Sequence, residues 1–381
     1  MKIGILGFGT VGGGVYEMLD HTGGLERGPV LVRPGKDRMP FMVTDVAAIL
    51  EDPTVDAVVE VLGGIEPAHT WVRSALLAGK HVVTANKALV VEHGLALAAL
   101  AREKGVAFLF SAACGGGVPF LHNLSLARRQ DEVLTLEGIL NGTTNYMLEA
   151  MQCRGVDYET ALADAQALGY AEADPSADVS GLDALRKMVL ACAVAFERLP
   201  REGTCHEGIT HLTVADMEDF QARGLTCRLM ARGGLSGGSV YAFVEPVLVS
   251  PAHPACAVKE NFNMARYEAR CAGQITLIGQ GAGRFPTASA VLRDLACIQA
   301  GHRAMLPENC VPAAADCDGC KHPYYVRVPA SFAGAFPAQQ VRLYGDLARI
   351  ITAPMTVKGM HRMASEIRSA GGAVFFAGME G

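Results

Sequence analysis

The glycine pattern at the start of the chain constrains its fold more than any other feature. An apolar run from Lys2 to Leu6 leads into the spacing G-x-G-x-x-G, at the point where a helical pattern opens. Its glycines are Gly7, Gly9 and Gly12. In such a motif the first glycine permits a tight turn, the second admits a pyrophosphate, and the third lets the helix pack closely. The pattern predicts a dinucleotide-binding turn, although a glycine turn without a ligand has the same local sequence.

Short apolar runs alternate with helical stretches after this turn. The expected strands are Lys2 to Leu6, Val30 to Val32, Ala57 to Val61, His81 to Thr84 and Val106 to Phe110. Helical spacing is found between them, from Pro67 to Ala78 and from Glu92 to Lys104. This alternation is typical of parallel strands joined by crossover helices. It predicts an α/β fold with a Rossmann-type, doubly wound parallel sheet.

The length of the chain and a change in its pattern indicate further domains. A chain of 381 residues exceeds the usual size of a single core, so we expect two or three domains. After Gly115 to Gly117 the alternation stops, and residues 226–279 contain several β segments separated by turns. A helix is expected from Pro286 to Ala300, and YYVRV at 324–328 opens a small third unit.

The charge and apolar patterns exclude several classes of partner. The formal net charge is -6 without a long basic run, which disfavours nucleic acids and anionic membranes as partners. No apolar run reaches the roughly eighteen residues that a membrane span needs. The N-terminal segment lacks a signal-peptide pattern, and we expect a cytoplasmic protein.

The cysteines predict no disulfide framework. There are 11 of them, mostly inside apolar segments as reduced, buried thiols are. The exception is the CDGC sequence of Cys317 and Cys320, which has Cys310 and His322 nearby. This spacing could hold a metal, but a complete set of four ligands is not evident, which favours a loop with incidental thiols.

Basic residues follow the second expected strand. Arg33 ends this strand, and Lys36 and Arg38 come next. An acid at this position would bind the ribose of NAD, whereas basic side chains suit the additional phosphate of NADP. Asp37 complicates this interpretation, and a solvated basic loop is the alternative. NADP is favoured, with NAD left open.

The charged stretch GYAEADPSADVSGLDALRK is the strongest candidate for chemistry. Its loop contains Glu172, Asp174 and Asp178, and a helix is expected to begin at about Ser180. A structural interpretation is available: a capping box of Ser180 with Asp183, and an exposed i,i+4 ion pair of Asp183 with Lys187. However, residues 188–196 are apolar on every side, which predicts a buried helix with this pair at its head. Ions so placed are usually retained beside a pocket, which favours a site that binds an amino group and moves a proton.

Lys87 follows the strand that ends at Thr84, in the sequence TANKAL. The carboxyl edge of an open parallel sheet is where ligands bind. A surface lysine at a helix start is the alternative, but it would face the positive end of the helix dipole. A ligand anion near Lys87 is therefore plausible.

Six motifs in order give the chain a close resemblance to homoserine dehydrogenase: GFGTVG, TANK, GGGVP, NGTTNYML, GYAEADPSADVSGLDALRK and GAGRFPTASAV. The resemblance covers about the first three hundred residues. It implies the NAD(P)-dependent interconversion of L-homoserine and L-aspartate 4-semialdehyde, in the biosynthesis of threonine, methionine and isoleucine.

The resemblance also implies an architecture. It consists of a nucleotide-binding domain at 1–130 completed by a helix at about 286–302, and an α+β substrate-binding and dimerisation domain at 131–285. A divergent ACT-like domain is expected at 320–381, and the subunits are expected to form a homodimer or homotetramer.

The resemblance assigns roles to individual residues. Lys187 is implied as proton donor and acceptor, with Asp183 beside it and Lys87 at the junction of nicotinamide and substrate. Glu172 is expected to bind the substrate ammonium, helped by Tyr170 and Asp178, in a pocket that Gly142 and Thr143 line. The cofactor-binding residues implied are Gly7, Phe8, Gly9, Thr10, Val11, Gly12, Arg33, Gly63, Thr84, Lys87, Gly281 and Gly283.

Two departures from the family pattern leave further expectations open. Ser111 stands where the family often has a Glu that binds a monovalent cation, so a Na⁺ or K⁺ site would rest on the carbonyls of Cys114, Gly116 and Val118. The C-terminal segment lacks the usual effector-loop pattern, and feedback control by threonine stays a hypothesis.

Two other functions compete with this interpretation. One is an NAD(P)-dependent dehydrogenase of another amino acid, and the other is a non-catalytic nucleotide-sensing relative. A sensor would be expected to lose its charged site residues first, yet Lys87, Glu172, Asp183 and Lys187 are all present.

Overall fold

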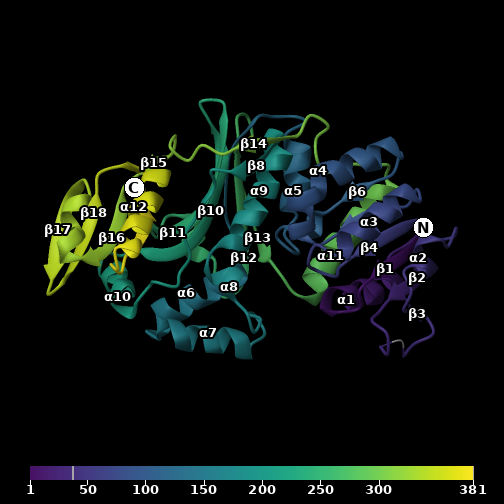
Figure 1. Cartoon of the computed structure of the whole chain (residues 1–381), viewed down its shortest axis with the longest axis horizontal. Coiled ribbons are helices and arrows are strands. Elements are labelled where there is room, and N and C mark those ends of the chain that lie inside the picture. The colour runs from purple at the N-terminus through teal and green to yellow at the C-terminus, as the bar shows by residue number, and fades with distance from the viewer. Residues whose placement is uncertain (37, 381) are drawn as a thin grey trace. The chain divides into compact units, whose positions relative to one another are not determined.

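The computed structural model describes residues 1–36 and 38–380, and the prediction about Asp37 lies outside them. The chain divides into two compact units (Figure 1). The first unit consists of Met1–Val133, Val189–Leu199 and Gly279–Val311. The second unit consists of Leu134–Met188, Pro200–Ile278 and the chain from Pro312 onward.

A six-stranded parallel sheet in the order β3-β2-β1-β4-β5-β6 forms the centre of the first unit. Its strands are β1 (Lys2–Leu6), β2 (Glu26–Leu31), β3 (Met42–Val43), β4 (Ala57–Glu60), β5 (His81–Thr84) and β6 (Phe108–Leu109). Its helices are α1 (Thr10–Met18), α2 (Ala47–Leu50), α3 (Ala68–Leu77), α4 (Lys87–Glu103), α5 (Phe120–Ala127) and α11 (Arg284–Gln299). The strand order reverses between β2-β1 and β1-β4, so the Rossmann-type prediction is confirmed.

The late helix α11 packs on α1 of the first unit. A Cβ atom at Gly14 would lie 2.8 Å from the carbonyl oxygen of Arg284, so the two helices meet backbone to backbone. Arg284 Nη2 also lies 2.6 Å from Glu17 Oε2. The glycine-rich first turns of α1 permit this close contact.

The second unit is built on a ten-stranded mixed sheet. Nine strands follow the order β13-β12-β7-β10-β11-β20-β16-β18-β17, and β9 pairs with β11. Their bounds are β7 (Val133–Ile139), β9 (Cys205–His206), β10 (Thr226–Ser236), β11 (Ser239–Val249), β12 (Phe262–Ala269), β13 (Gly273–Gln280), β16 (Tyr324–Pro329), β17 (Ala338–Tyr344), β18 (Leu347–Thr352) and β20 (Phe375–Met379).

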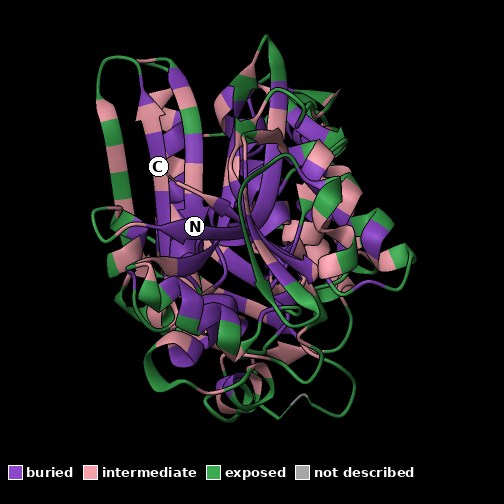
Figure 2. Cartoon of the chain, turned by 90° about the vertical axis from the view of Figure 1, so that its left-hand side faces the viewer, coloured by how far each residue is buried: buried purple, intermediate pink, exposed green. Residues whose placement is uncertain are grey.

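The helices that accompany this sheet contain part of the charged stretch GYAEADPSADVSGLDALRK. They are α6 (Gly142–Arg154), α7 (Tyr158–Ala167), α8 (Ser176–Val179), α9 (Leu182–Phe196), α10 (Val214–Ala222) and α12 (Val357–Ser369). Two small sheets complete the described fold, formed by β8 (Arg198–Glu202) with β14 (Val311–Ala314) and by β15 (Lys321–His322) with β19 (Met355–Thr356). Buried residues concentrate in the strands and on the inner faces of the helices (Figure 2).

The C-terminal segment belongs to the second of the two compact units. The reason is that β20 pairs in parallel with β11, with Val247 opposite Gly378 and Leu248 opposite Met379. The sheet therefore continues from β11 through β20 into β16, β18 and β17. A core of its own, which includes Tyr324, Phe376 and Met360, packs between these strands and α12.

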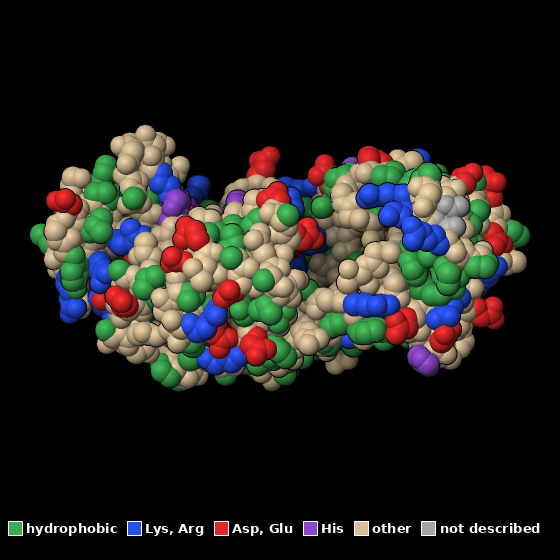
Figure 3. All heavy atoms as spheres, turned by 90° about the horizontal axis from the view of Figure 1, so that it is seen from below, with side chains coloured by type: hydrophobic (Ala, Val, Ile, Leu, Met, Phe, Trp, Pro, Cys, Tyr) green, Lys and Arg blue, Asp and Glu red, His purple; other side chains and the backbone are tan. Residues whose placement is uncertain are grey.

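No helix in the described part of the chain is long and apolar enough to cross a bilayer. On the face shown in Figure 3, basic and acidic side chains are interspersed over most of the surface.

Candidate active site

The glycine turn of the first unit has the geometry that its sequence predicts. Gly7 has a φ of 107°, a value that side chains disfavour. A Cβ at Gly12 would lie 2.1 Å from the carbonyl oxygen of Gly7, so only glycine allows the helix to approach the turn. No heavy atom lies within 4 Å of a Cβ built at Gly9, which caps α1. The start of α1 is therefore open to an anionic ligand.

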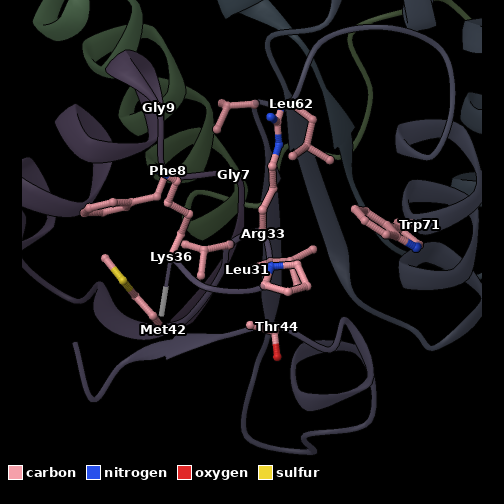
Figure 4. A pocket seen from close by; sticks show the side chains of 13 residues that line it. Gly7, Phe8, Gly9, Leu31, Arg33, Lys36, Met42, Thr44, Leu62 and Trp71 are labelled. Atoms are coloured by element: carbon pink, nitrogen blue, oxygen red, sulfur yellow. The ribbon is translucent and has the colours of Figure 1, made fainter. Parts of the chain in front are cut away.

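A cavity of about 780 Å³ lies at the carboxyl ends of β1, β2 and β4. Figure 4 shows Arg33 extending into it between Phe8 and Trp71. The predicted cofactor residues among its lining are Gly7, Phe8, Gly9 and Arg33. Lys36 also lines it, which places two basic side chains at the end of β2.

Other lining residues were not predicted. They include Met42, Thr44, Leu62 and Trp71, whose side chains come from segments without a motif. Of the remaining predicted cofactor residues, Thr10, Val11 and Gly12 lie in α1 next to this cavity, whereas Gly63, Thr84, Lys87, Gly281 and Gly283 are not part of its lining.

Thr84 belongs to a buried network that fixes the start of α4. Its hydroxyl lies 2.5 Å from Glu60 Oε2, and the Leu62 amide donates to Glu60 Oε1 at 2.8 Å. The Asn86 side chain donates to the Gly64 carbonyl at 2.6 Å and accepts from the Leu89 amide. This network holds the turn after β4 against the first residue of α4, which is Lys87.

The sequence pattern did not single out Glu60, because AVVE at 57–60 has the apolar pattern of a buried strand. Burial raises the pKa of this carboxyl group, and the hydrogen bonds from Thr84 and Leu62 oppose the shift. The signal for a special role was an acid within an apolar strand, followed by two glycines with positive φ, Gly63 and Gly64.

The glycine-rich turn after Ser111 is held by a carboxylate of α11. The amide and hydroxyl of Ser111 donate to Asp294 at 2.7 and 2.5 Å. Asp294 is fully buried, and burial raises its pKa to about 7 although these hydrogen bonds lower it. A Cβ at Gly116 would lie 2.4 Å from the carbonyl oxygen of Gly281, so no side chain fits at Gly116.

Lys187 and Asp183 form an ion pair at the start of α9 in the second unit. Lys187 Nζ lies 2.7 Å from Asp183 Oδ2, and it donates to the carbonyl oxygen of Leu140 at 2.7 Å. The side chains of Lys187 and Asp183 are only 12% and 8% exposed. A pair so shielded from water interacts more strongly than a surface pair.

Asn141 connects this pair to the acidic loop. Its amide nitrogen donates to Asp178 Oδ1 at 2.7 Å and to Asp183 Oδ2 at 2.9 Å. Its amide oxygen caps α6 by accepting from the Thr144 amide at 2.9 Å. The structure thus brings Asp178, Asp183 and Lys187 together around a residue that the sequence interpretation did not select. The signal was present, because Asn141 opens the NGTTN motif.

The helix starts two residues later than expected, and the capping box suggested for Ser180 and Asp183 is wrong. Gly181 has a φ of 84°, which ends the preceding turn, and α9 begins at Leu182. Asp183 instead accepts hydrogen bonds from Asn141 and Lys187. The carboxylate therefore faces a side-chain cluster and not the helix end.

The remaining predicted substrate residues lie around the start of α6. The Thr143 hydroxyl donates to the carbonyl oxygen of Tyr170 at 2.6 Å. A Cβ at Gly142 would lie 2.5 Å from the carbonyl oxygen of Asn261, so no larger residue fits. Glu172 lies in an exposed loop, where its main-chain oxygen accepts from Gln166. Among the described residues, the cluster that Asn141 forms with Asp178, Asp183 and Lys187 therefore does not include Glu172.

Among the described residues, those of the CDGC sequence do not belong to a group of three ligand atoms close enough to share a metal ion. Within residues 1–36 and 38–380, the trio whose ligand atoms lie within 4.8 Å of one another is Glu137, His253 and Glu380. That trio is paired with arginines, since Arg266 Nη1 lies 3.2 Å from Glu137 Oε1 and Arg232 contacts Glu380. These positive charges occupy the place that a cation would take.

Comparison with known proteins identifies both units. Residues 7–111 match the family model described as the NAD binding domain of homoserine dehydrogenase. Residues 119–296 match the model described as homoserine dehydrogenase. The matched segments contain the glycine turn, Lys87 and the Lys187 cluster.

Proteins that are similar to this chain over most of its length are also homoserine dehydrogenases. A homoserine dehydrogenase of Synechocystis sp. is 37% identical over 348 residues, or 86% of this chain and 79% of the relative. One from Corynebacterium glutamicum is 41% identical over 77% of this chain and 70% of the relative. A solved homoserine dehydrogenase from Thiobacillus denitrificans superposes with a TM-score of 0.89 at 28% identity, covering 100% of this chain and 98% of that one. We conclude that the chain belongs to the homoserine dehydrogenase family, whose members are NAD(P)-dependent oxidoreductases.

Proposed function

We propose that Lys187 and Asp183 move the proton in the interconversion of L-homoserine and L-aspartate 4-semialdehyde. The observation that carries the proposal is the shielded pair on α9, where Lys187 is anchored by both Asp183 and the Leu140 carbonyl. Two fixed acceptors hold the ammonium group in one position. A fixed donor is what general acid–base catalysis requires.

The roles of the two residues follow from their chemistry. In reduction of the aldehyde, Lys187 donates a proton to the carbonyl oxygen as it becomes an alkoxide. In oxidation of the alcohol, the neutral amine of Lys187 accepts the hydroxyl proton. Asp183 stabilises the ammonium form of Lys187, and the hydrogen bond from Asn141 fixes the orientation of the Asp183 carboxylate. The nicotinamide, when bound, supplies or accepts the hydride.

The acidic loop between α7 and α9 is proposed to bind the substrate ammonium. Glu172 and Asp178 supply the negative charge, and the Tyr170 carbonyl is fixed by Thr143. Glu172 is exposed on this loop, and we propose that its carboxylate contacts the substrate ammonium. A zwitterionic substrate needs such carboxylates, which a simple alcohol does not.

The cofactor is proposed to be NADP in preference to NAD. Arg33 and Lys36 line the cavity beyond β2, where a 2′-phosphate would extend. A solved hyperthermophilic archaeal homoserine dehydrogenase, 25% identical over 79% of this chain with a TM-score of 0.68, is in complex with NADPH. Gly63, Thr84, Gly281 and Gly283 are proposed to contact the rest of the cofactor, with Lys87 near the nicotinamide.

Further properties implied by the resemblance are proposals of lower priority. They are a Na⁺ or K⁺ site at the carbonyls of Cys114, Gly116 and Val118, an ACT-like role for residues 320–381 in binding threonine, a homodimer or homotetramer, and a cytoplasmic location. Titration of activity with K⁺ and with threonine, and light scattering in solution, test the first three.

The proposed activity is tested by nicotinamide absorbance with L-homoserine and either NAD⁺ or NADP⁺. Wild type is expected to turn over with at least one cofactor, and Lys187→Ala to lose nearly all activity. Lys104→Ala is the matched control, because Lys104 lies at the exposed end of α4 beside Glu103. Absence of turnover by wild type with both cofactors would contradict the function, whereas an active Lys187→Ala would contradict only the assigned role.

A further inference from the structure

Two cysteines far apart in the sequence lie side by side in the second unit. Cys205 is in β9, and Cys317 lies in the segment after β14. Their side chains pack in one apolar cluster with Phe243 and Val357. We propose that Cys205 and Cys317 are a redox couple that forms a reversible disulfide. Its formation displaces residues 207–209, which pack against the turn before α9.

The backbone holds both cysteines in place. Cys205 pairs with Phe243 of β11, while the thiol of Cys317 donates to the neighbouring Ala242 carbonyl at 3.6 Å. The two segments also touch each other, since the Ala315 amide donates to the Glu202 carbonyl at 2.7 Å. A Cβ at Gly203 would lie 2.2 Å from the carbonyl oxygen of Ala315. Two thiols held in contact in this way can close a disulfide without unfolding.

The surroundings favour reaction at this pair. Cys317 is fully buried, whereas Cys205 is partly exposed, so a small oxidant reaches the pair past Cys205. The neighbouring Cys205 thiol lowers the pKa of Cys317, whereas Cys317 and burial raise the pKa of Cys205. Cys317 is therefore the thiol of the pair that more readily forms a thiolate, the form that reacts.

The chemistry proposed is oxidation by a peroxide. The Cys317 thiolate attacks one oxygen of hydrogen peroxide, the O–O bond breaks, and the leaving hydroxide takes a proton to become water. The resulting sulfenic acid condenses with the Cys205 thiol, forming the S–S bond and releasing a second water. Two thiols are oxidised and one peroxide is reduced to two waters. A thiol reductant reverses the bond by exchange.

The segment that follows Cys205 lies directly against the turn before α9. The Ile209 amide donates to the Val179 carbonyl at 2.9 Å. A Cβ at Gly208 would lie 1.9 Å from that same carbonyl oxygen, so there is no free space between the two backbones. Gly181 lies against the same segment, because its Cβ would lie 3.1 Å from the Glu207 carbonyl oxygen.

A displacement of Cys205 is therefore transmitted to the start of α9. Closing the disulfide brings the two sulfur atoms to a separation of about 2 Å, which draws β9 toward residues 315–317. Residues 207–209 move with it and press on residues 179–181, two residues before Asp183. A displacement of this size at a catalytic residue lowers kcat by on the order of tenfold or more.

The disulfide is tested first by mapping, independently of activity. The reduced full-length protein is treated with hydrogen peroxide, remaining thiols are alkylated, and a non-reducing digest is analysed by mass spectrometry. A peptide linking Cys205 to Cys317, lost on reduction, is expected in wild type and in Cys153→Ser. Cys153 is the matched control, because it is an exposed thiol at the end of α6. Absence of the linked peptide at full oxidation would overturn the proposal.

The effect on turnover is tested with the same samples, and this part alone rests on the proposed function. Oxidised wild type is expected to lose kcat by about tenfold and to regain it with a thiol reductant. Cys205→Ser should keep its activity under peroxide, and Cys317→Ser should behave alike. If cross-linked wild type turns over at the reduced rate, or if Cys205→Ser is inactivated equally, the coupling to α9 is overturned. An inactive reduced enzyme would instead count against the proposed function, and the mapping would still decide the redox couple.

Discussion

Lys187 Nζ lies 2.7 Å from Asp183 Oδ2, one helical turn away on α9, and Asn141 donates to the same oxygen at 2.9 Å. The carboxylate oxygen thus accepts from a cation and from an amide at once. Such charge-assisted hydrogen bonds fix both partners more firmly than a surface ion pair does. The orientation of Lys187 therefore depends on Asn141 as well as on Asp183.

Replacing Asn141 should impair catalysis more than stability. Asn141→Ala removes the bonds to Asp178 and Asp183, so kcat/KM for L-homoserine is expected to fall by about 10- to 100-fold. It also removes the cap of α6, which costs about 1 kcal/mol of unfolding free energy. Steady-state kinetics and urea denaturation measure the two effects.

The matched control for Asn141 is Asp157, which caps α7 through the Thr160 amide at 2.8 Å. Asp157→Ala should lose a similar amount of stability and keep its kcat. If both variants lose activity in proportion to their loss of stability, Asn141 has only a capping role.

Arg33 should contribute to the choice of nucleotide. Arg33→Ala is expected to raise the KM for NADP⁺ by about tenfold, since a hydrogen bond to a charged group contributes about 1.5 to 3 kcal/mol. The KM for NAD⁺ should change little. Arg38→Ala serves as the control, because Arg38 is exposed on the same loop and does not line the cavity. Equal effects of Arg33→Ala on both cofactors would contradict a 2′-phosphate contact.

Asp294 should make stability depend on pH. Burial raises the pKa of Asp294 to about 7 in the folded chain, above its ordinary value of 3.8, which applies to the unfolded chain. Its contribution is therefore fully present below the unfolded pKa and is lost as the pH rises through the folded pKa. Asp294→Asn lacks this dependence.

The pH effect is measured as the difference in unfolding free energy between Asp294→Asn and wild type. This difference should shift in favour of the variant by about 2 kcal/mol between about pH 5 and about pH 8. In the variant the amide oxygen of Asn can accept from the Ser111 amide, and its amide nitrogen can donate to the Ser111 hydroxyl oxygen. A difference that does not change with pH would show that Asp294 does not titrate in this range.

Glu245 should be essential to the attachment of the C-terminal segment. This carboxylate is fully buried on β11, with His322 Nε2 at 2.6 Å and the Tyr324 hydroxyl at 3.2 Å. Burial alone would raise its pKa, but His322 and His361 lower it to about 2. Its contribution to stability is present above the unfolded pKa and is lost as the pH falls toward the folded value.

Glu245→Leu leaves His322 and Tyr324 without their acceptor and removes the carboxylate that lies 3.6 Å from His361. We therefore expect a loss of about 3 kcal/mol of unfolding free energy at neutral pH. The control is Glu366→Leu, since Glu366 is exposed on α12 and forms only a long pair with Arg362, at 3.8 Å. Equal urea midpoints for the two variants would contradict this assignment.

Local patterns predicted the parts of the fold that local physics determines. Gly12 could be recognised from its spacing to Gly7, because a side chain at Gly12 would collide with the carbonyl oxygen of Gly7. The buried helix α9 could be recognised because its apolar residues surround the whole axis. The spacing of Asp183 and Lys187 within that helix then placed both side chains on one face.

Contacts between distant residues could not be predicted in the same way. Asn141 and Asp183 are 42 residues apart, and Ser111 and Asp294 are 183 apart, so neither pair has a local signal. The start of α9 was misplaced because Ser180 is a good cap by type, whereas the left-handed turn at Gly181 decides where the helix begins. Trp71 reaches the cavity from a helix whose sequence resembles any amphipathic helix.

The central claim, that Lys187 transfers the proton, is tested most directly by chemical rescue. Lys187→Ala should reduce kcat for L-homoserine oxidation by about 10² to 10⁴-fold, and a small primary amine added to the variant should restore part of it. Lys104→Ala should be fully active and insensitive to the amine. If Lys187→Ala retains most of its activity, or if it folds normally and no amine restores turnover, Lys187 is not the group that moves the proton.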